Sequence, residues 1–377
     1  MKKILFVTSG LTHGGVNKSL LNLLSKMNRD NFEIDIYSLY QSGPYRKLFD
    51  GYSLLPTEGI APTLLGYNAF SESNTLIDFY IKISTHLFPK SYCEKIGRTL
   101  SEKNYDIVVS FQEGFTTRLA TYIKAKKHIA WIHCDYSRYI NNKKHNEANM
   151  YQRYDHIVAV SEYTAKVVKE YLPSVADKVT AIYNVMDSEG ILSLSKVGID
   201  DERFKSNDFT LISIGRMDPV KRFSHIPAIA RELKRENILF RWYIIGDGGS
   251  EKEQVIEEIK KNNVQNEVIL LGAKNNPYSY LKHANVLVCP SLSEAYPNVV
   301  NEAKILHIPV VAADFPSAKE LIDNGVNGYI SPISEIPSIL QSLCLNTQLY
   351  NKLCENIRNY NYENRSILQK VYELFDC

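Results

Sequence analysis

The chain is poor in cysteine, and its cysteines follow no pattern. Six occur among 377 residues, with no Cys-x-x-Cys pair and no paired spacing. Because a chain of this length can bury a core without disulfide bonds, the sparse cysteines predict free thiols in a reducing cytoplasm. They also argue against a zinc site, and we expect no bound metal.

Long hydrophobic runs are absent as well. No stretch approaches the ~18–20 apolar residues that a membrane-spanning helix needs. The chain opens with a basic pair, Lys2 and Lys3, but the apolar run from Ile4 to Val7 is shorter than the roughly 7–15 residues of a signal-peptide core. We interpret this run as a buried first strand and expect a cytoplasmic protein.

No excess of charge of one sign points to nucleic acid. Lys and Arg number 44 and Asp and Glu 42, for a net charge of +2. Residues 1–185 contain 23 basic and 17 acidic side chains, and the rest of the chain contains 21 and 25. This modest basic bias is too dispersed for a nucleic-acid surface. It suits an anionic ligand or the inner face of the cell membrane, although an ordinary solvated surface explains it equally well.

Several familiar catalytic motifs are missing or incomplete. The glycine spacing of a P-loop occurs near the N-terminus, but Val16 stands where that loop requires lysine. Gly246 and Gly248 begin a dinucleotide-binding fingerprint, but Glu251 occupies its third glycine position. The chain also has no GxSxG, HExxH or EF-hand sequence. Nucleotide hydrolysis, hydride transfer, acyl transfer and metalloproteolysis are therefore disfavoured.

The sequence does contain a repeated alternation of short apolar runs with amphipathic segments. Such alternation is typical of βα units, and fully apolar runs indicate strands that are covered on both faces of a parallel sheet. The expected strands are residues 3–9, 32–39, 105–111, 128–133, 156–161, 209–215, 241–248, 267–272, 285–291 and 309–314. The alternation is lost between Asn184 and Lys196, where we place a boundary between domains of residues 1–185 and 195–354.

Two amphipathic segments lie outside this alternation. Residues 74–104 carry large apolar side chains at helical spacing, and we interpret them as a helix pair in the core rather than as a membrane-facing surface. The side chains concerned are Phe79, Tyr80, Ile83, Leu87 and Phe88. Residues 355–377 also have the pattern of an amphipathic helix.

Four local features indicate a binding site at strand ends, where ligands of open α/β sheets bind. Gly14 and Gly15 follow the first strand and precede a helix, so a phosphate could approach backbone N–H groups there, with a plain turn as the alternative. Arg216 and Lys221 follow Gly215 at the end of another strand. Two fixed cations at such a position suit a diphosphate, whereas the alternative is a solvated loop.

The other two features are a pair of carboxylates and a histidine. Glu294 is expected in the loop before a helix and Glu302 about one turn into it, with Pro297 near the helix start. Carboxylates accept hydrogen bonds from sugar hydroxyls, and free N–H groups at the start of a helix can bind phosphate. The alternative is that an early glutamate only caps the helix. His133 ends an apolar run, where imidazole can hydrogen-bond a hydroxyl or act as an acid or base, although a lone histidine is more often structural.

The segments SIGRMDPVKRF and SLSEAYPNVVNEA together resemble the family 4 retaining glycosyltransferases of the bacterial surface-polysaccharide type. Glu294 and Glu302 match the family's Glu-x7-Glu signature. Arg216 and Lys221 match its Gly-Arg-x4-Lys signature. The N-terminal glycine pair and His133 also stand at the expected places. The resemblance covers nearly the whole chain and is strongest for residues 205–330.

The resemblance implies the GT-B fold, in which two Rossmann-like domains face a central cleft. By that likeness, residues 1–185 would bind the acceptor and residues 195–354 the nucleotide-sugar donor. A C-terminal helix, residues 355–377, would pack back on the first domain. Closure on binding is expected of two domains around a cleft.

The resemblance also implies roles for individual residues. Arg216 and Lys221 would hold the diphosphate. Glu302 would accept hydrogen bonds from the ribose, while Glu294 and His133 would face the transferred sugar. The other donor contacts would come from Gly14, Gly15, Gly215, Ala273, Lys274, Tyr296, Pro297, Asn298 and Val299, with the backbone of Ala273 and Lys274 meeting the base.

The implied mechanism is electrostatic. As the bond between the sugar C1 and the phosphate breaks, Arg216, Lys221 and the helix N-terminus would stabilise the charge gained by the nucleoside diphosphate. Members of the family need no divalent metal, and retention is thought to follow a front-face route in which the leaving phosphate helps to deprotonate the acceptor. No cofactor is expected beyond a nucleotide-sugar donor, with UDP the favoured carrier, and the acceptor would be a glycan or a lipid-linked saccharide.

One residue departs from the family pattern, and other functions stay open. Tyr296 stands where phenylalanine is common, and its hydroxyl would tune sugar choice or point to solvent. A nucleotide-sugar epimerase of the same fold would convert UDP-sugars without an acceptor. A phosphorylase would need a pyridoxal phosphate lysine, and no lysine stands out for that role. A non-catalytic partner subunit would bind sugar nucleotide without turnover.

Overall fold

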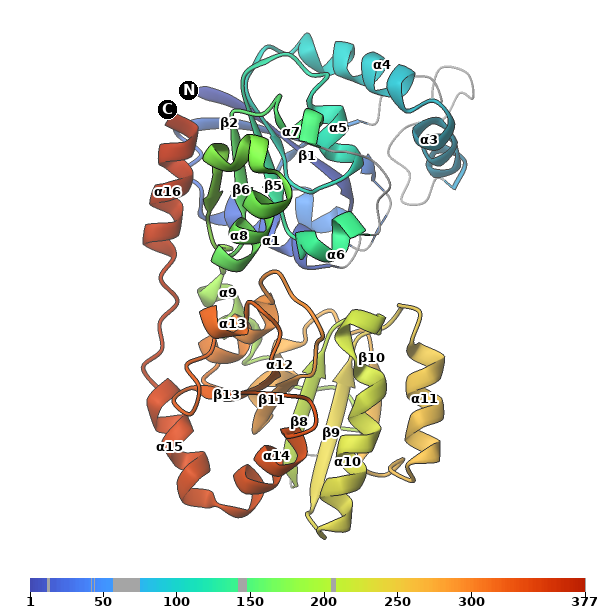
Figure 1. The fold of residues 1–377 in the computed structure, drawn as a ribbon, viewed down its shortest axis with the longest axis vertical. Helices are drawn as coiled ribbons and strands as arrows, with labels where there is room; N and C mark the ends of the chain where they lie inside the picture. Colours follow the sequence, from blue (N-terminus) through green and yellow to red (C-terminus); the bar gives the residue numbers. More distant parts are fainter. Residues whose placement is uncertain are drawn as a thin grey trace. The chain divides into compact units, whose positions relative to one another are not determined.

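The computed structural model describes residues 1–11, 14–41, 43, 45–56, 75–141, 148–204 and 208–376, apart from the side chains of residues 75–80 and 141. The chain divides into two compact units (Figure 1). Unit 1 is Met1–Val185 with Asn364–Cys377, and unit 2 is Met186–Glu363. Each unit is built around a parallel sheet, as the alternation of apolar runs and helical segments predicts.

Unit 1 contains a parallel sheet with the described strand order β3-β2-β1-β4-β5-β6-β7. Its strands are β1 (Lys2–Gly10), β2 (Phe32–Tyr40), β3 (Ser53–Leu55), β4 (Tyr105–Ser110), β5 (Ala125–Ile132), β6 (His156–Ala159) and β7 (Val179–Ala181). Its helices are α1 (Gly15–Lys26), η1 (Arg46–Phe49), α3 (Thr75–Leu87), α4 (Pro89–Ser101), α5 (Phe115–Ala120), α6 (Tyr136–Asn141), α7 (Ala148–Tyr151), α8 (Glu162–Tyr171), η2 (Pro173–Lys178) and α16 (Asn364–Asp376). The strand order reverses between β1 and β4.

Unit 2 contains a second parallel sheet with the described order β10-β9-β8-β11-β12-β13. Its strands are β8 (Phe209–Ile214), β9 (Phe240–Ile245), β10 (Val268–Gly272), β11 (Val286–Cys289), β12 (Val310–Ala313) and β13 (Gly328–Ser331). Its helices are α9 (Ser188–Leu194), η3 (Pro219–Lys221), η4 (Phe223–His225), α10 (Ile226–Arg235), α11 (Lys252–Lys261), α12 (Tyr278–Lys282), α13 (Asn298–Ile305), η5 (Ala318–Glu320), α14 (Ile336–Leu345) and α15 (Thr347–Ile357). Here the order reverses between β8 and β11.

Every strand that the apolar runs predict is present at its expected place. Their central residues are buried on both faces, as in Ile4 to Val7 of β1 and Val286 to Cys289 of β11. Three further strands among the described residues, β3, β7 and β13, were not predicted. Each has three or four residues and lies at a sheet edge, so it is too short to show a periodic pattern.

The amphipathic segment of residues 74–104 forms α3 and α4, but its interpretation as core is wrong for three side chains. Ile83, Leu87 and Phe88 are 37, 62 and 63% exposed. Ile83 and Leu87 are four residues apart and share one face of α3, whereas Ile81 is buried on another face. Asn74 and the side chains of Phe79 and Tyr80 lie outside the described residues. No helix in the described ranges is long and apolar enough to cross a membrane.

Helix α16 completes the core of unit 1 although it follows unit 2 in the sequence (Figure 1). The ring of Phe375 packs edge-on against that of Phe32, with centroids 5.8 Å apart. Lys2 and Lys127 donate hydrogen bonds to the carbonyl oxygens of Phe375 and Leu374, at 2.9 and 3.1 Å. These cations satisfy carbonyl groups at the helix C-terminus and complement its dipole. The returning helix begins at Asn364, later than the expected residue 355.

Within unit 2, the loop after β9 passes very close to the loop after β8. A Cβ on Gly249 would stand 2.3 Å from the carbonyl oxygen of Met217, and a Cβ on Gly246 would stand 1.9 Å from that of Gly215. Gly249 also has a φ of +88°, which residues with side chains rarely adopt. The amide of Met217 donates a hydrogen bond to the carbonyl of Gly248 at 3.1 Å. Gly246, the start of the incomplete dinucleotide fingerprint, therefore has a packing role.

We expect Gly249→Ala to lower the free energy of unfolding by about 1–3 kcal/mol, because the added methyl group overpacks against backbone. Gly198→Ala is the matched control, since a Cβ there meets nothing within 4 Å. Urea unfolding of the two variants and the unmodified protein measures the difference. Equal stability of the two variants would contradict the close approach of these loops.

Candidate functional site

Each sheet has a point where its strand order reverses, and ligands of open α/β sheets bind there, outside the carboxyl ends of the strands. In unit 2 this point lies between β8 and β11, and in unit 1 between β1 and β4. The loop after β8 carries Arg216 and Lys221, and the loop after β11 carries Glu294. The topology thus brings together residues that the sequence singles out in separate motifs.

Lys221 and Glu294 form an ion pair across the reversal point of unit 2. The Lys221 Nζ lies 2.5 Å from the Glu294 Oε1, and the two side chains are 24 and 12% exposed. Burial acts to lower the pKa of Lys221, but nearby negative charge, that of Glu294 first, leaves the pKa raised above its ordinary value. Lys221 is therefore a fixed cation at neutral pH.

Arg216 is the more exposed of the two predicted cations. Its guanidinium lies 2.9 Å from a carboxylate oxygen of Asp218, and its side chain is 65% exposed. The Arg216 charge acts against the raised pKa of Lys221, so the two cations lie close enough to influence each other. An exposed ion pair contributes little stability, so Arg216 can exchange Asp218 for a more highly charged anion.

Two serines fix the loop that carries Glu294. The Ser291 hydroxyl donates to Oε1 of Glu294 at 2.7 Å, and the Ser317 hydroxyl donates to its carbonyl oxygen at 2.8 Å. Helix α13 then begins at Asn298, with no side-chain hydrogen bond to its N-terminal cap and no acidic residue in its first turn. Helix capping by Glu302 is therefore not observed. Glu302 lies in the next turn and is buried.

The hydroxyl of Tyr296 does not point to solvent. It lies 3.2 Å from the hydroxyl of Tyr362, which is buried in the segment between α15 and α16. In the same segment, the ring of Tyr360 lies under the ammonium of Lys304, 4.3 Å from the ring centroid. Lys304 belongs to α13, so the segment of residues 358–363 braces both α13 and the loop before it.

The two predicted base-contact residues, Ala273 and Lys274, follow the edge strand β10. The Lys274 ammonium lies 2.7 Å from a carboxylate oxygen of Asp201. Its side chain therefore does not join the ion pair of Lys221 and Glu294.

Unit 1 carries the other predicted residues. Gly14 is the N-terminal cap of α1 and Gly15 its first residue, with no side-chain hydrogen bond at the cap. His133 follows β5, and its backbone N–H donates to Oε2 of Glu113 at 3.0 Å. Burial lowers the pKa of His133 to about 3, so the imidazole is neutral at physiological pH. Its buried Nε2 has no hydrogen-bond partner among the described residues. The ring is therefore suited to hydrogen bonding rather than to supplying a proton.

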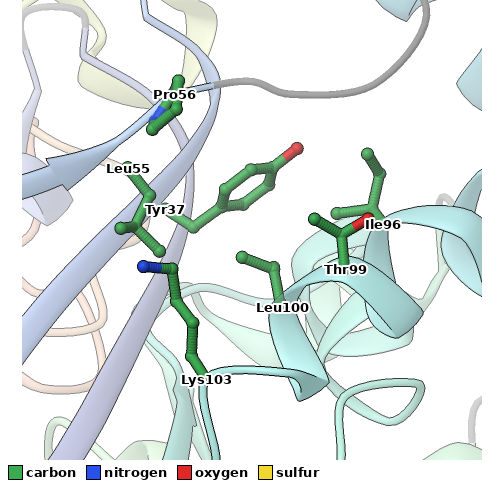
Figure 2. A pocket seen from close by; sticks show the side chains of 7 residues that line it. All are labelled: Tyr37, Leu55, Pro56, Ile96, Thr99, Leu100 and Lys103. Atoms are coloured by element: carbon green, nitrogen blue, oxygen red, sulfur yellow. The ribbon is translucent and has the colours of Figure 1, made fainter.

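Unit 1 also has a small cavity of about 80 Å³. Figure 2 shows Tyr37, Ile96 and Leu100 around it, between β2 and α4. The lining is mostly apolar, with Lys103 as its charged member, and it includes none of the predicted site residues. Within the described ranges, no group of three or more His, Cys, Asp or Glu side chains could hold a metal ion. The polar residues that the sequence singles out meet instead at the reversal point of unit 2, where Lys221 and Glu294 pair.

Several residues that support this site could not be identified from the sequence. Ser291 stands three positions before Glu294 and begins the segment SLSEAYPNVVNEA. This position was the one signal in the sequence for a contact with Glu294. Ser317, Asp201 and Tyr362 come from segments 23 or more residues away from their partners. No spacing rule connects such segments, so only the fold reveals these contacts.

Two protein-family models match the chain, one over each unit. The model described as Glycosyltransferase Family 4 matches residues 13–189. The model described as Glycosyl transferases group 1 matches residues 198–363. Together they span nearly all of the chain.

Individual relatives agree with these models. An uncharacterized glycosyltransferase of Methanocaldococcus jannaschii is 30% identical over 166 residues, which are 44% of this chain and 41% of that protein. The UDP-Gal:alpha-D-GlcNAc-diphosphoundecaprenol alpha-1,3-galactosyltransferase of Escherichia coli is 23% identical over 89% of this chain and 93% of its own. The crystal structure of Anabaena Alr3699/HepE in complex with UDP and glucose has a TM-score of 0.78, with 19% identity and 99% of each chain covered.

The contact between Tyr296 and Tyr362 can be tested with a double-mutant cycle. We expect Tyr296→Phe and Tyr362→Phe to be non-additive, with a coupling of about 0.5–1.5 kcal/mol in the free energy of unfolding, the range of one neutral hydrogen bond. Chemical denaturation of the unmodified protein, both single variants and the double variant supplies the four values. Strict additivity would show that the two hydroxyls do not interact.

Proposed function

The chain belongs to the family 4 glycosyltransferases of the GT-B fold, and we propose that it moves a sugar, with retention at C1, from a nucleoside diphosphate sugar to a saccharide acceptor. The observation that carries this proposal is the pairing of Lys221 with Glu294 at the reversal point of unit 2. A second cation, Arg216, and the start of α13 lie on the same two loops. This arrangement offers positive charge for a diphosphate and a carboxylate for sugar hydroxyls.

We propose UDP as the carrier of the donor sugar. In support, the Escherichia coli relative is named for a UDP-Gal donor, and the Anabaena structure contains UDP. Arg216 and Lys221 would bind the diphosphate, and Glu302 would accept hydrogen bonds from the ribose. The backbone at Gly215, Tyr296, Pro297, Asn298 and Val299 would line the phosphate and the sugar, and that at Ala273 and Lys274 the base.

The proposed reaction needs charge stabilisation more than a protein nucleophile. The bond between C1 and the phosphate oxygen breaks, an acceptor oxygen forms the new bond to C1, and the acceptor proton passes to the leaving phosphate. Negative charge grows on the diphosphate, so Lys221, Arg216 and the α13 N-terminus stabilise the transition state more than the ground state. Losing one such contact typically costs about 10²–10³ in rate. With two cations in place, we propose that no divalent metal is needed.

Residues of unit 1 complete the proposal. Gly14 and Gly15 would bring backbone N–H groups of α1 to the diphosphate. His133, neutral because of its burial, would hydrogen-bond the transferred sugar rather than carry a proton. The rest of unit 1 would bind the acceptor.

We further propose that the acceptor is lipid-linked and that the protein works at the inner face of the cell membrane, in the synthesis of cell-surface polysaccharide. The Escherichia coli relative is named for a diphosphoundecaprenol acceptor. Ile83 and Leu87 of α3 and Phe88, which lies between α3 and α4, are exposed, and exposed basic side chains occur in the same segment. The exposed basic residues are Lys82, Lys90, Lys95 and Arg98. Apolar side chains flanked by cations suit an anionic bilayer surface.

The two alternative functions on the same fold differ in what they require. An epimerase would convert a UDP-sugar in the absence of any acceptor. A non-catalytic subunit would bind nucleotide but release no UDP with any acceptor. Such a subunit would have no need of Lys221 and Glu294 in a geometry that serves bond cleavage, which favours the transferase.

The donor site can be tested by thermal unfolding with UDP, GDP and ADP. We expect one diphosphate, UDP, at ~100 times its Kd, to add about 2.7 kcal/mol of stability. EDTA should leave the shift unchanged, because Arg216 and Lys221 supply the positive charge. Glu302→Ala should lose the shift, since the ribose loses its acceptor.

Glu253→Ala is the control for that experiment, because Glu253 is an exposed glutamate on α11 of the same unit. It should bind UDP as the unmodified protein does. Stabilisation by none of the three diphosphates would refute the proposed donor site.

Membrane contact can be tested by co-sedimentation with phosphatidylglycerol vesicles at low salt. We expect the unmodified protein to bind them and to ignore vesicles of phosphatidylcholine alone. Leu87→Glu combined with Phe88→Glu should abolish binding, because it places two anions on the proposed contact face. Leu239→Glu, at a position 79% exposed in unit 2, should bind normally. Failure of the unmodified protein to bind at low salt would exclude this contact.

A further inference from the structure

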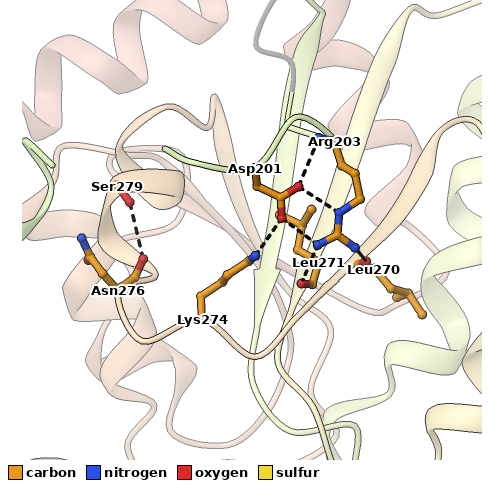
Figure 3. A network of polar contacts seen from close by, with 7 residues as sticks. All are labelled: Asp201, Arg203, Leu270, Leu271, Lys274, Asn276 and Ser279. Carbon is orange, nitrogen blue, oxygen red and sulfur yellow. Dashed lines mark hydrogen bonds and ion pairs between the residues drawn. The ribbon is translucent and has the colours of Figure 1, made fainter. Parts of the chain in front are cut away.

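Residues 201–204, which precede β8, are fastened to the end of β10 by a polar network (Figure 3). The Arg203 guanidinium donates hydrogen bonds to the carbonyl oxygens of Leu270 and Leu271, each at 3.1 Å. These carbonyls belong to the last residues of β10, immediately before the loop that starts at Ala273. The segment therefore holds the strand end from which the loop departs.

The Asp201 carboxylate lies at the centre of this network. It accepts hydrogen bonds from Nε and NH2 of Arg203 at 2.8 and 2.6 Å and from Nζ of Lys274 at 2.7 Å. The backbone N–H of Arg203 donates to it as well, at 3.1 Å. The side chain of Asp201 is 8% exposed. Arg203 first, and Lys274 second, hold the pKa of Asp201 well below its usual range, so this buried group stays ionised.

Aromatic packing anchors the same segment. The ring of Phe204 packs against those of Tyr243 and Tyr280, with centroids 4.6 and 5.3 Å away. The Lys274 ammonium also lies 5.5 Å from the Tyr280 ring centroid. Residues 201–204 are thus held against unit 2 by apolar contacts. Because Asp201 belongs to this segment, its ion pair also holds the Lys274 side chain in place.

The far end of the loop is fixed independently. The Asn276 side chain donates to the carbonyl of Leu194 at 2.9 Å and accepts from the backbone N–H of Tyr278 at 3.1 Å. Figure 3 shows the Lys274 side chain pointing toward Asp201. Both ends of residues 273–276 are therefore held, and the charge of Lys274 is neutralised within the protein.

We propose that Asp201 is a positioning residue for recognition of the donor base, because it holds the backbone of residues 273–276 in a single geometry. This inference rests on the proposed function, in which that backbone meets the base. Backbone N–H and C=O groups can select one base only if they stay in place. A loose loop can adapt to the hydrogen-bond pattern of another base, and it binds any base more weakly because binding must first order the loop. With Asp201 neutral, Lys274 has no ionised partner, and the loop loses its attachment through Lys274 while Asn276 still holds its far end.

The test is isothermal titration of Asp201→Asn with UDP and ADP over a range of salt concentrations. We expect UDP binding to weaken about tenfold, the scale of one lost charge-assisted hydrogen bond. The preference for UDP over ADP should shrink, because the loop no longer selects the base. The slope of log Kd against log salt should stay unchanged, because Asp201 does not touch the phosphates.

Two further variants sharpen the experiment. Lys274→Met removes the other half of the contact and should reproduce the loss of UDP affinity and of base preference, which keeps the test available if Asp201→Asn does not fold. Asp208→Asn breaks a different ion pair of the same unit, with Arg241 at 3.0 Å. Asp208 precedes β8, at the opposite end from the site loops, so its variant should bind UDP and ADP as the unmodified protein does.

The outcomes separate the positioning role of Asp201 from the proposed function. Folded Asp201→Asn and Lys274→Met proteins with unchanged UDP affinity and base preference overturn the positioning role alone. A changed salt slope in either variant also overturns it, because that result means direct electrostatic action on the diphosphate. Failure of the unmodified protein to bind any nucleoside diphosphate overturns the proposed function, and the positioning role with it.

Discussion

The ion pair of Lys221 and Glu294 determines the geometry around the reversal of strand order in unit 2, because a charge withdrawn from water is costly unless it is paired. Lys221 comes from the loop after β8 and Glu294 from the loop after β11, so their pairing joins the two halves of the sheet. The hydroxyl of Ser291 donates a hydrogen bond to the same carboxylate oxygen, Oε1. Only three residues separate Glu294 from Asn298, where α13 begins, so the helix start stays close to the paired carboxylate. A single ion pair thus places positive charge, a carboxylate and a helix terminus together.

Support for this region comes from outside the motifs that compose it. From the segment before β8, Asp201 holds the loop after the edge strand β10, and Tyr362 reaches the loop before α13 from the segment after α15. Both contacts act on loops rather than on strands, because the strands are already held by their ladders of hydrogen bonds. The loop after β9 approaches so closely that Gly246 and Gly249 leave no room for a side chain. Contacts from outside the motifs therefore hold several loops of unit 2 in place, and none of them would be identified as functional by its residue type.

Much of this arrangement could be predicted from the sequence, and the limits of that prediction have physical causes. Fully apolar runs identify buried parallel strands, so the loops that hold Lys221 and Glu294 could be placed at strand ends before the fold was known. Contacts such as that between Tyr296 and Tyr362 depend on chain segments 66 residues apart, which no local pattern links. The exposure of Leu87 was misjudged because helical spacing shows that apolar residues share a face but not what covers it. The neutral state of His133 depends on burial, which only packing reveals.

The return of α16 to unit 1 affects how the chain acquires its structure during synthesis. Residues 364–376 are made only after the whole of unit 2. At ribosomal rates of about 5–20 residues per second, unit 2 takes roughly 10–40 s to synthesise. For that time Phe32 lacks the ring of Phe375, and Lys2 and Lys127 lack the carbonyl groups that they bond in the finished protein. The nascent first unit thus leaves the ribosome with an uncovered apolar face, a surface of the kind that chaperones bind, and the unit that is begun first is the last to be completed.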